Sequence, residues 1–183
     1  MSEKIKDGVI KTYDDEGEIK TSITYKNGKK NGLFKKYKYG ILIEKGHFKD
    51  GKIEGILKTY DYNSGGNELE YTYTYKKGIK EGPFKKYDYG CLEHKGSYKK
   101  GKIEGKLKFF YEDGSLYRLE TFKNGILHGP YNYYTRDGVQ ISEGFFKNGY
   151  SHGPYKLFTV DGKLYEKGRH EFNRKIIEWS SDK

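Results

Sequence analysis

A near-fixed repeat is the feature that most constrains how this chain can fold. Each unit opens with an aromatic residue and a lysine, continues as Gly-x-x-x-Gly, and carries further aromatic residues before the next turn. The six full units begin at Tyr25, Phe48, Tyr75, Tyr98, Phe122 and Phe146. Successive starts are 23, 27, 23, 24 and 24 residues apart. A period in the twenties indicates an array of short structural repeats.

The composition favours β-structure for these repeats. The chain has 25 glycines, most of them at repeat positions, and it contains no alanine. Long helices need good helix formers and are destabilised by frequent glycine, so we do not expect a helical array. The charged fraction of 34% is typical of disordered chains, but aromatic residues make up 17% and recur at fixed positions. We therefore expect a folded all-β array.

Each unit is predicted to form two short strands. Gly-x-x-x-Gly is interpreted as one turn, because glycine adopts positive φ without steric cost. A second turn is expected at Gly40, Gly90, and the Asp-Gly pairs at 113–114, 137–138 and 161–162. In the returning strand, Leu116 and Phe122 are an even number of residues apart and are expected on one face. The predicted fold is an elongated single-sheet antiparallel meander of about fifteen strands, which must twist. Whether the sheet also curls into a gutter stays open.

The repeats divide the chain into three segments. Residues 1–24 form a degenerate N-terminal capping repeat, residues 25–169 hold the six hairpin repeats, and residues 170–183 form a C-terminal cap or tail. FKKYKYG at 34–40 returns as FKKYDYG at 84–90, which indicates that a block of two units was duplicated. Whether the ends of the array also stack into an end-to-end homodimer stays open.

The repeats resemble MORN repeats, in particular a bacterial variant of that family. GILHGPYNYYTRDG at 125–138 and GYSHGPYKLFTVDG at 149–162 carry the resemblance best. It implies a β-hairpin array that acts as a scaffold, as a module at a membrane surface, or as an antitoxin similar to the YwqK-like proteins. In the last case, the partner would be a toxin that the protein neutralises.

The number and positions of the lysines indicate which class of partner the protein binds. The formal net charge is +10, and residues 25–121 hold 22 basic and 13 acidic side chains. Such an excess favours an acidic protein surface, nucleic acid or an anionic membrane as the partner. One lysine recurs next to the opening aromatic residue, at Lys26, Lys49, Lys76, Lys99, Lys123 and Lys147. A second set recurs at Lys35, Lys58, Lys85, Lys108 and Lys156.

Aromatic residues alternate with the second set of lysines. Single-stranded nucleic-acid binders combine a basic stripe with aromatic platforms in this way. The same pattern also fits a purely structural role, in which the aromatic residues form the core of a one-layer sheet and the lysines prevent aggregation of its edges. The duplicated block selects the following residues as the predicted partner-binding set: Lys35, Lys36, Tyr37, Tyr39, Lys58, Lys85, Lys86, Tyr87, Tyr89 and Lys108.

No arrangement of residues predicts catalysis. His128 and His152 recur because the repeat recurs, and Glu54 and Glu104 are explained by the duplication. The single Cys91 has no consistent histidine partner, and no spacing indicates a metal or a cofactor. The charged N-terminal residues lack the apolar stretch of a signal peptide, so a cytoplasmic location is expected.

The sequence therefore predicts a non-enzymatic protein that binds and neutralises another macromolecule by occlusion. A toxin, a nuclease or a CRISPR effector with an acidic surface fits that hypothesis. A scaffold that binds anionic lipid, and direct binding of RNA or single-stranded DNA, are the two alternatives.

Overall fold

The computed structural model describes residues 6–181, and within this range it is all-β, with nineteen strands and no helix. Consequently, no helix among these residues is long and apolar enough to cross a membrane. The chain divides into two compact units, Met1–Gly90 and Cys91–Lys183. The predicted antiparallel meander of hairpins is confirmed in each of them.

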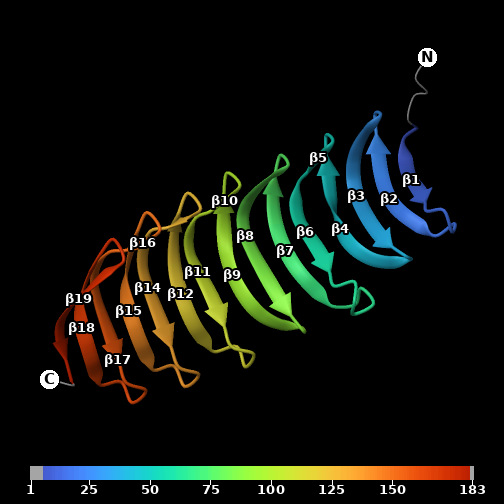
Figure 1. Cartoon of the computed structure of the whole chain (residues 1–183). Helices are drawn as coiled ribbons and strands as arrows, with labels where there is room; N and C mark the ends of the chain where they lie inside the picture. Colours follow the sequence, from blue (N-terminus) through green and yellow to red (C-terminus); the bar gives the residue numbers. More distant parts are fainter. Residues whose placement is uncertain (1–5, 182–183) are drawn as a thin grey trace. The chain divides into compact units, whose positions relative to one another are not determined.

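The first unit contains eight strands, and each lies beside the one before it in the chain, except that β5 and β6 both lie beside β4 (Figure 1). They are β1 (Gly8–Tyr13), β2 (Ile19–Lys26), β3 (Lys29–Lys38), β4 (Ile41–Lys49), β5 (Lys52–Ile53), β6 (Gly55–Tyr60), β7 (Leu69–Lys76) and β8 (Ile79–Asp88). Every pairing between them is antiparallel, with β4 pairing with both β5 and β6.

The second unit repeats this arrangement over eleven strands. They are β9 (Cys91–Lys99), β10 (Lys102–Ile103), β11 (Gly105–Phe110), β12 (Leu116–Lys123), β13 (Ile126–Leu127), β14 (Gly129–Tyr134), β15 (Gln140–Lys147), β16 (Tyr150–Ser151), β17 (Gly153–Phe158), β18 (Leu164–Glu171) and β19 (Arg174–Ser180). Among the described residues, the nineteen strands belong to one sheet, and the first and last strands of either unit do not pair with each other, so the sheet is open in each unit. The alternative of a gutter, which the sequence leaves open, is not realised, because the sheet is not strongly curled in either unit.

Four strands are interrupted by a single residue, which explains why nineteen strands are present where about fifteen were expected. Glu54 separates β5 from β6, and Glu104, His128 and His152 do the same in later repeats. Each of these residues still donates its backbone N–H to the neighbouring strand; for Glu54 the acceptor is the carbonyl of His47 at 2.9 Å. Counting each interrupted pair as one strand gives fifteen.

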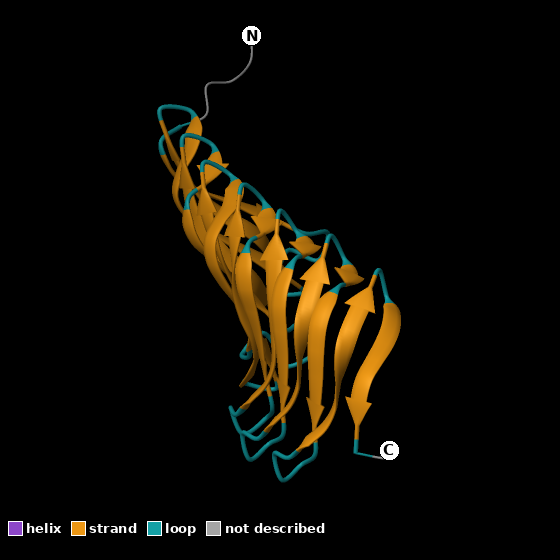
Figure 2. Cartoon of the chain, turned by 90° about the vertical axis from the view of Figure 1, so that its left-hand side faces the viewer, coloured by secondary structure: helices purple, strands orange, loops and turns teal. Residues whose placement is uncertain are grey.

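The Gly-x-x-x-Gly motif is only partly a turn, which corrects the sequence interpretation. Between β2 and β3 the turn consists of Asn27 and Gly28, with φ of 52° and 72°. A two-residue turn with both φ values positive matches the twist of an antiparallel hairpin. The second glycine of the motif, Gly32, lies inside β3. Loops connect the strands at both of their ends (Figure 2).

The Asp-Gly pairs lie in turns as predicted, but these turns are longer than a tight hairpin. Residues 111–115 connect β11 to β12, and the N–H of Tyr111 donates to the carbonyl of Ser115 at 2.9 Å. A β-bulge follows, where the register shifts between Phe109 and Phe110. The extra residue inverts the alternation of side chains. The prediction that Leu116 and Phe122 share a face is therefore wrong.

Aromatic rings form the core of one sheet face by lying over glycines. Phe34 is 0% exposed, and it lies opposite Gly46, whose missing Cβ would come within 3.0 Å of the ring. In the second unit, Tyr131 covers Gly144 in the same way. A single-layer sheet has no opposing layer, so it excludes water by packing a ring against the bare backbone of a glycine.

Candidate binding face of the first unit

The strand register of the first unit places lysines from successive strands in one row. Lys35 on β3 is directly opposite Lys45 on β4, and Lys45 is directly opposite Lys58 on β6. The row continues through Thr72 on β7 to Lys85 on β8. We call Lys35, Lys45, Lys58 and Lys85 the lysine row, and the side of the sheet that carries it the lysine face.

Two further rows flank the lysine row on the same face, because side chains two residues apart along a strand share a face. On one side lies a row in which Leu33, Ile56 and Pro83 alternate with His47 and Thr74, and we call its three apolar members the apolar row. Leu33 is 42% exposed and Ile56 is 56% exposed. On the other side lies the tyrosine row, which consists of Tyr37, Tyr60 and Tyr87, all half-buried.

A shallow pocket of about 230 Å³ lies on this face where Thr72 replaces a lysine. It is lined by Ile56, Lys58, Thr72, Thr74, Pro83, Lys85 and Tyr87. Its walls therefore combine the apolar row with two lysines, so the pocket offers an apolar surface beside positive charge.

The lysine row is not neutralised by the protein itself. Among residues 6–181, no carboxylate lies within 4.0 Å of the amine of any of its four members. On the opposite face, in contrast, the amine of Lys36 forms an ion pair with Glu44 at 2.9 Å. Like charges directly opposite each other on neighbouring strands are destabilising. The fold therefore retains repulsion on the lysine face that an acidic ligand would relieve.

The structure brings together only part of the predicted binding set. Lys35, Tyr37, Lys58, Lys85 and Tyr87 lie on the lysine face.

The rest of that set lies elsewhere. Lys36 and Lys86 point to the opposite face, where the amine of Lys86 is 5.9 Å from the ring of Tyr71. Tyr39 and Tyr89 occupy the tips of two-residue turns, are 61% and 87% exposed, and have φ of 49° and 45°. Positive φ is rare for so bulky a residue.

Sequence reasoning missed Lys45, the central member of the row. Its amine is 5.4 Å from the ring of Tyr60. Lys45 belongs to the returning strand, outside the set that recurs at 35, 58 and 85. Only the register between β3, β4 and β6 places it between Lys35 and Lys58.

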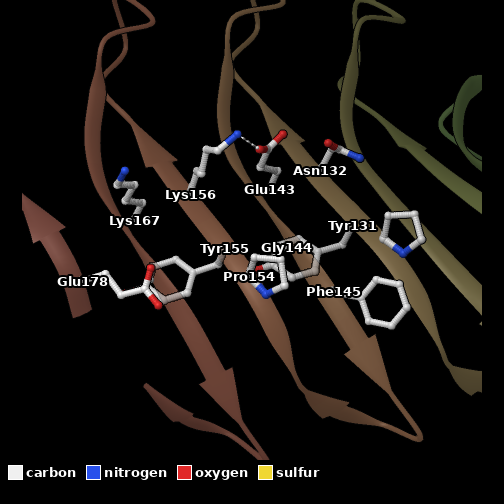
Figure 3. Close-up of a pocket in the computed structure, with 12 residues that line it drawn as sticks. Tyr131, Asn132, Glu143, Gly144, Phe145, Pro154, Tyr155, Lys156, Lys167 and Glu178 are labelled. Atoms are coloured by element: carbon white, nitrogen blue, oxygen red, sulfur yellow. Dashed lines mark ion pairs between the residues drawn. The ribbon is translucent and has the colours of Figure 1, made fainter. Parts of the chain in front are cut away.

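The second unit has the corresponding row, but it is interrupted. Lys108, the remaining predicted residue, is opposite Lys95 on one side and Leu119 on the other. Further along, Asn132, Glu143, Lys156 and Lys167 lie side by side (Figure 3). Glu143 forms an ion pair with Lys156 at 2.9 Å, and they line a shallow pocket of about 350 Å³. Internal pairing and apolar residues thus dilute the charge of this row.

Glu54, Glu104 and His128, which precede the second glycine of the Gly-x-x-x-Gly motif, have a structural role. Glu54 accepts the backbone N–H of Lys77 in the next turn at 2.6 Å, and Glu104 accepts that of Asn124 at 2.7 Å. The Nδ1 atom of His128 lies 3.4 Å from the backbone nitrogen of Asn148. These side chains therefore tie each hairpin turn to the next repeat.

Within residues 6–181, no group of three or more His, Cys, Asp or Glu side chains is arranged to hold a metal ion. Cys91, at the start of β9, is exposed.

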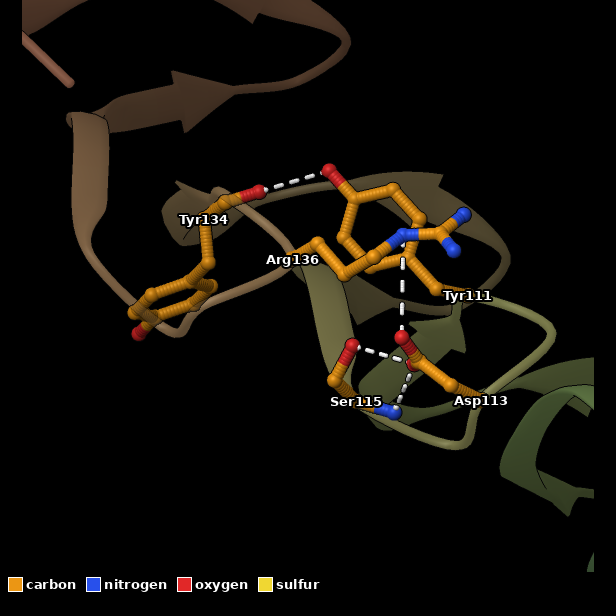
Figure 4. Close-up of polar contacts among 5 residues, drawn as sticks. All are labelled: Tyr111, Asp113, Ser115, Tyr134 and Arg136. Atoms are coloured by element: carbon orange, nitrogen blue, oxygen red, sulfur yellow. Dashed lines mark hydrogen bonds and ion pairs between the residues drawn. The ribbon is translucent and has the colours of Figure 1, made fainter.

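The loops of the second unit are joined by polar contacts (Figure 4). The hydroxyl of Tyr111 donates to the carbonyl of Tyr134 at 3.0 Å, and Arg136 forms an ion pair with Asp113 at 3.6 Å. Hydrogen bonds from Ser115, together with Arg136, hold the pKa of Asp113 below its usual range. These contacts connect successive loops and leave the sheet faces free.

A polar cluster around the buried carboxylate of Glu166 joins the last three strands, β17, β18 and β19. The hydroxyl of Tyr155 donates to Glu166 at 2.7 Å, and the amine of Lys175 forms an ion pair with the same carboxylate at 2.7 Å. Burial alone would raise the pKa of Glu166, but the contacts with Lys175 and Tyr155 outweigh it and lower that pKa. The cluster satisfies a buried charge and cross-links β17, β18 and β19.

Comparisons with known proteins identify no family for this chain. No protein-family model matches the chain, and no curated protein sequence matches it. A solved structure described as "Crystal Structure of TarM" is similar over 66% of this chain, with 13% sequence identity and a TM-score of 0.30. The match spans 20% of that protein's chain.

Proposed function

We propose that this protein is a non-enzymatic binding protein that neutralises a protein partner by covering an acidic surface of it with the lysine face. The observation that carries the proposal is the unpaired run of Lys35, Lys45 and Lys58 on three successive strands. Each partner carboxylate that reaches this row relieves repulsion already present in the free protein. Complementary charge of this kind speeds association and selects against basic surfaces.

The two turn-tip tyrosines supply a second kind of contact. Tyr39 and Tyr89 project from hairpin ends of the first unit and are largely exposed. Tyrosine is enriched among the residues that contribute most to binding energy at protein interfaces. An array that offers charge on one face and aromatic anchors at one end is suited to cover a partner over an extended area.

The resemblance to bacterial MORN-type repeats supports the same proposal. The confirmed hairpin array is the fold expected of such repeats, and YwqK-like members are antitoxin proteins. By analogy, the partner is a toxin, a nuclease or a CRISPR effector whose working surface is acidic.

Direct binding of single-stranded nucleic acid is the second candidate, since the lysine row would also attract phosphates. The tyrosine row argues against it. Stacking of bases requires open ring faces, whereas Tyr37, Tyr60 and Tyr87 are half-buried and the amine of Lys45 lies over Tyr60. Binding of anionic lipid has no separate observation in its favour.

Affinity capture from the source cells, with and without nuclease, tests the proposal when two variants are compared. Lys35→Gln/Lys45→Gln/Lys58→Gln removes the lysine row. Lys26→Gln/Lys49→Gln/Lys76→Gln removes the same charge from strand ends of the same unit; Lys49, for example, lies on the same face four residues beyond Lys45, about 13 Å along β4. We expect a stoichiometric protein complex that survives nuclease, is retained by the second variant and is lost by the first. Capture of nucleic acid alone, or equal capture by both variants, would contradict the proposal.

A further inference from the structure

We infer that the segment of the partner that lies on the lysine face is an acidic amphipathic α-helix, placed across the strands of the first unit. This inference rests on the proposed function and names the chemistry of the partner at that site. It is drawn from the spacing of the lysine row, from the apolar row beside it, and from the pocket at Thr72.

The spacing along the lysine row fits the pitch of a helix. Neighbouring strands are about 4.8 Å apart, so three successive lysines span roughly 10 Å. A helix rises about 5.4 Å per turn, so carboxylates at i, i+4 and i+7 span roughly 10.5 Å on one side. One acidic stripe therefore faces Lys35, Lys45 and Lys58 together, one side chain for each strand.

The spacing across the rows fits the width of a helix. The apolar row lies two residues along each strand from the lysine row, which is about 6.7 Å. Neighbouring stripes on a helix about 10 Å wide are separated by a similar distance. A helix that presents its acidic stripe to the lysines thus presents an adjacent apolar stripe to Leu33, Ile56 and Pro83. These three residues lie on alternate strands, with His47 and Thr74 between them, and Ile56 is 56% exposed.

The pocket lies at the point where a threonine takes the place of a lysine in the lysine row. Thr72 interrupts the row between Lys58 and Lys85, and the pocket of about 230 Å³ opens there against Ile56 and Pro83. A leucine or phenylalanine of the helix fits a site that is apolar on one side and basic on the other. An extended acidic strand fits less well, because its side chains on one face repeat every 6.6–6.8 Å, roughly, and drift out of step with the strands.

The test measures binding of defined peptides to the full-length protein by fluorescence anisotropy at about 0.15 M salt. The probe is a labelled helical peptide of about 20 residues, roughly 30 Å long, with one glutamate stripe and one neighbouring leucine stripe. Its control carries the same charges and leucines but has two central prolines, which prevent the helix. An oligothymidylate of similar length is the nucleic-acid probe.

We expect the helical peptide to bind at least tenfold more tightly than the proline peptide and more tightly than the oligothymidylate. Replacing Lys35, Lys45 and Lys58 by glutamine should weaken the affinity for the helical peptide by about tenfold, because three exposed ion pairs together contribute about that much binding free energy. The variant that lacks Lys26, Lys49 and Lys76 should bind nearly as the wild type does. Ile56→Ser should weaken the helical peptide and leave the proline peptide unchanged.

Equal binding of the helical and proline peptides, or tighter binding of the oligothymidylate, would overturn the inference. The proposed function would stand if capture of a protein from cells still depended on the lysine row. If neither the capture of a protein nor the binding of the peptide depended on the lysine row, the proposed function and the helix inference would both be wrong.

Discussion

Lys45→Glu is predicted to stabilise the free protein while it abolishes partner binding. Lys45 has a lysine directly opposite it on each side, Lys35 and Lys58. The new carboxylate would be flanked by two amines, so that it imitates the acidic group that we expect the partner to supply. A substitution that improves folding and removes function is what a binding site under internal repulsion should show.

The magnitude follows from the cross-strand pairs. Opposed side chains have Cβ atoms roughly 5 Å apart, and each like or unlike charge pair changes stability by about 0.2–1 kcal/mol. The substitution replaces two repulsions by two attractions, but it removes the contact between the amine and Tyr60, worth about 0.5–1 kcal/mol. The net expected gain is about 1–2 kcal/mol in the free energy of unfolding at low salt.

Urea unfolding at low and high salt provides the assay. Screening over about 3 Å at 1 M salt should remove most of the gain. The internal control is the same substitution in a Lys35→Gln/Lys58→Gln background, where the gain should vanish because no charged neighbour remains. Destabilisation at low salt, or a gain that survives both high salt and the double background, would refute the assignment of these three lysines to one row.

Three further predictions concern the scaffold. Glu104→Ala should destabilise the protein by about 0.5–1.5 kcal/mol, measured by urea unfolding, because the next turn loses its side-chain acceptor, whereas Glu104→Gln should cost less. Gly144→Ala should cost about 1–3 kcal/mol in the same assay and alter the near-UV circular dichroism, because the new Cβ would displace the ring of Tyr131. The carboxyl pKa of Glu166 is lowered in the folded state, so its contribution should be present above pH 4.5 and be lost as pH falls below it. Glu166→Gln should therefore flatten the fall in stability with acid, and an unchanged pH profile would contradict that assignment.

The repeat period was sufficient to predict the architecture. Aromatic openers at fixed intervals and glycine-containing turns specify hairpins, and the meander follows because each hairpin can pack only on its neighbours. The interruption at Glu54 and the bulge near Phe109 were not predictable, because both depend on how the backbone of one strand fits against the next.

The binding face was only partly predictable for the same reason. Alternation along one strand separates Lys35 from Lys36, and that step needs only the sequence. Placing Lys45 beside Lys35 and Lys58 requires the register of three strands, which a single bulge can shift by one residue. The role of Glu104 as an acceptor for the next turn likewise depends on contacts between repeats.

A lysine footprint of the complex with the captured partner tests the central claim most directly. The free protein and the complex are treated with an acetylating reagent, and the modification of each lysine is quantified by mass spectrometry. We predict that Lys35, Lys45 and Lys58 become protected in the complex while Lys26 and Lys49 stay reactive. Uniform protection, or protection confined to the strand-end lysines, would contradict the claim that the lysine row contacts the partner.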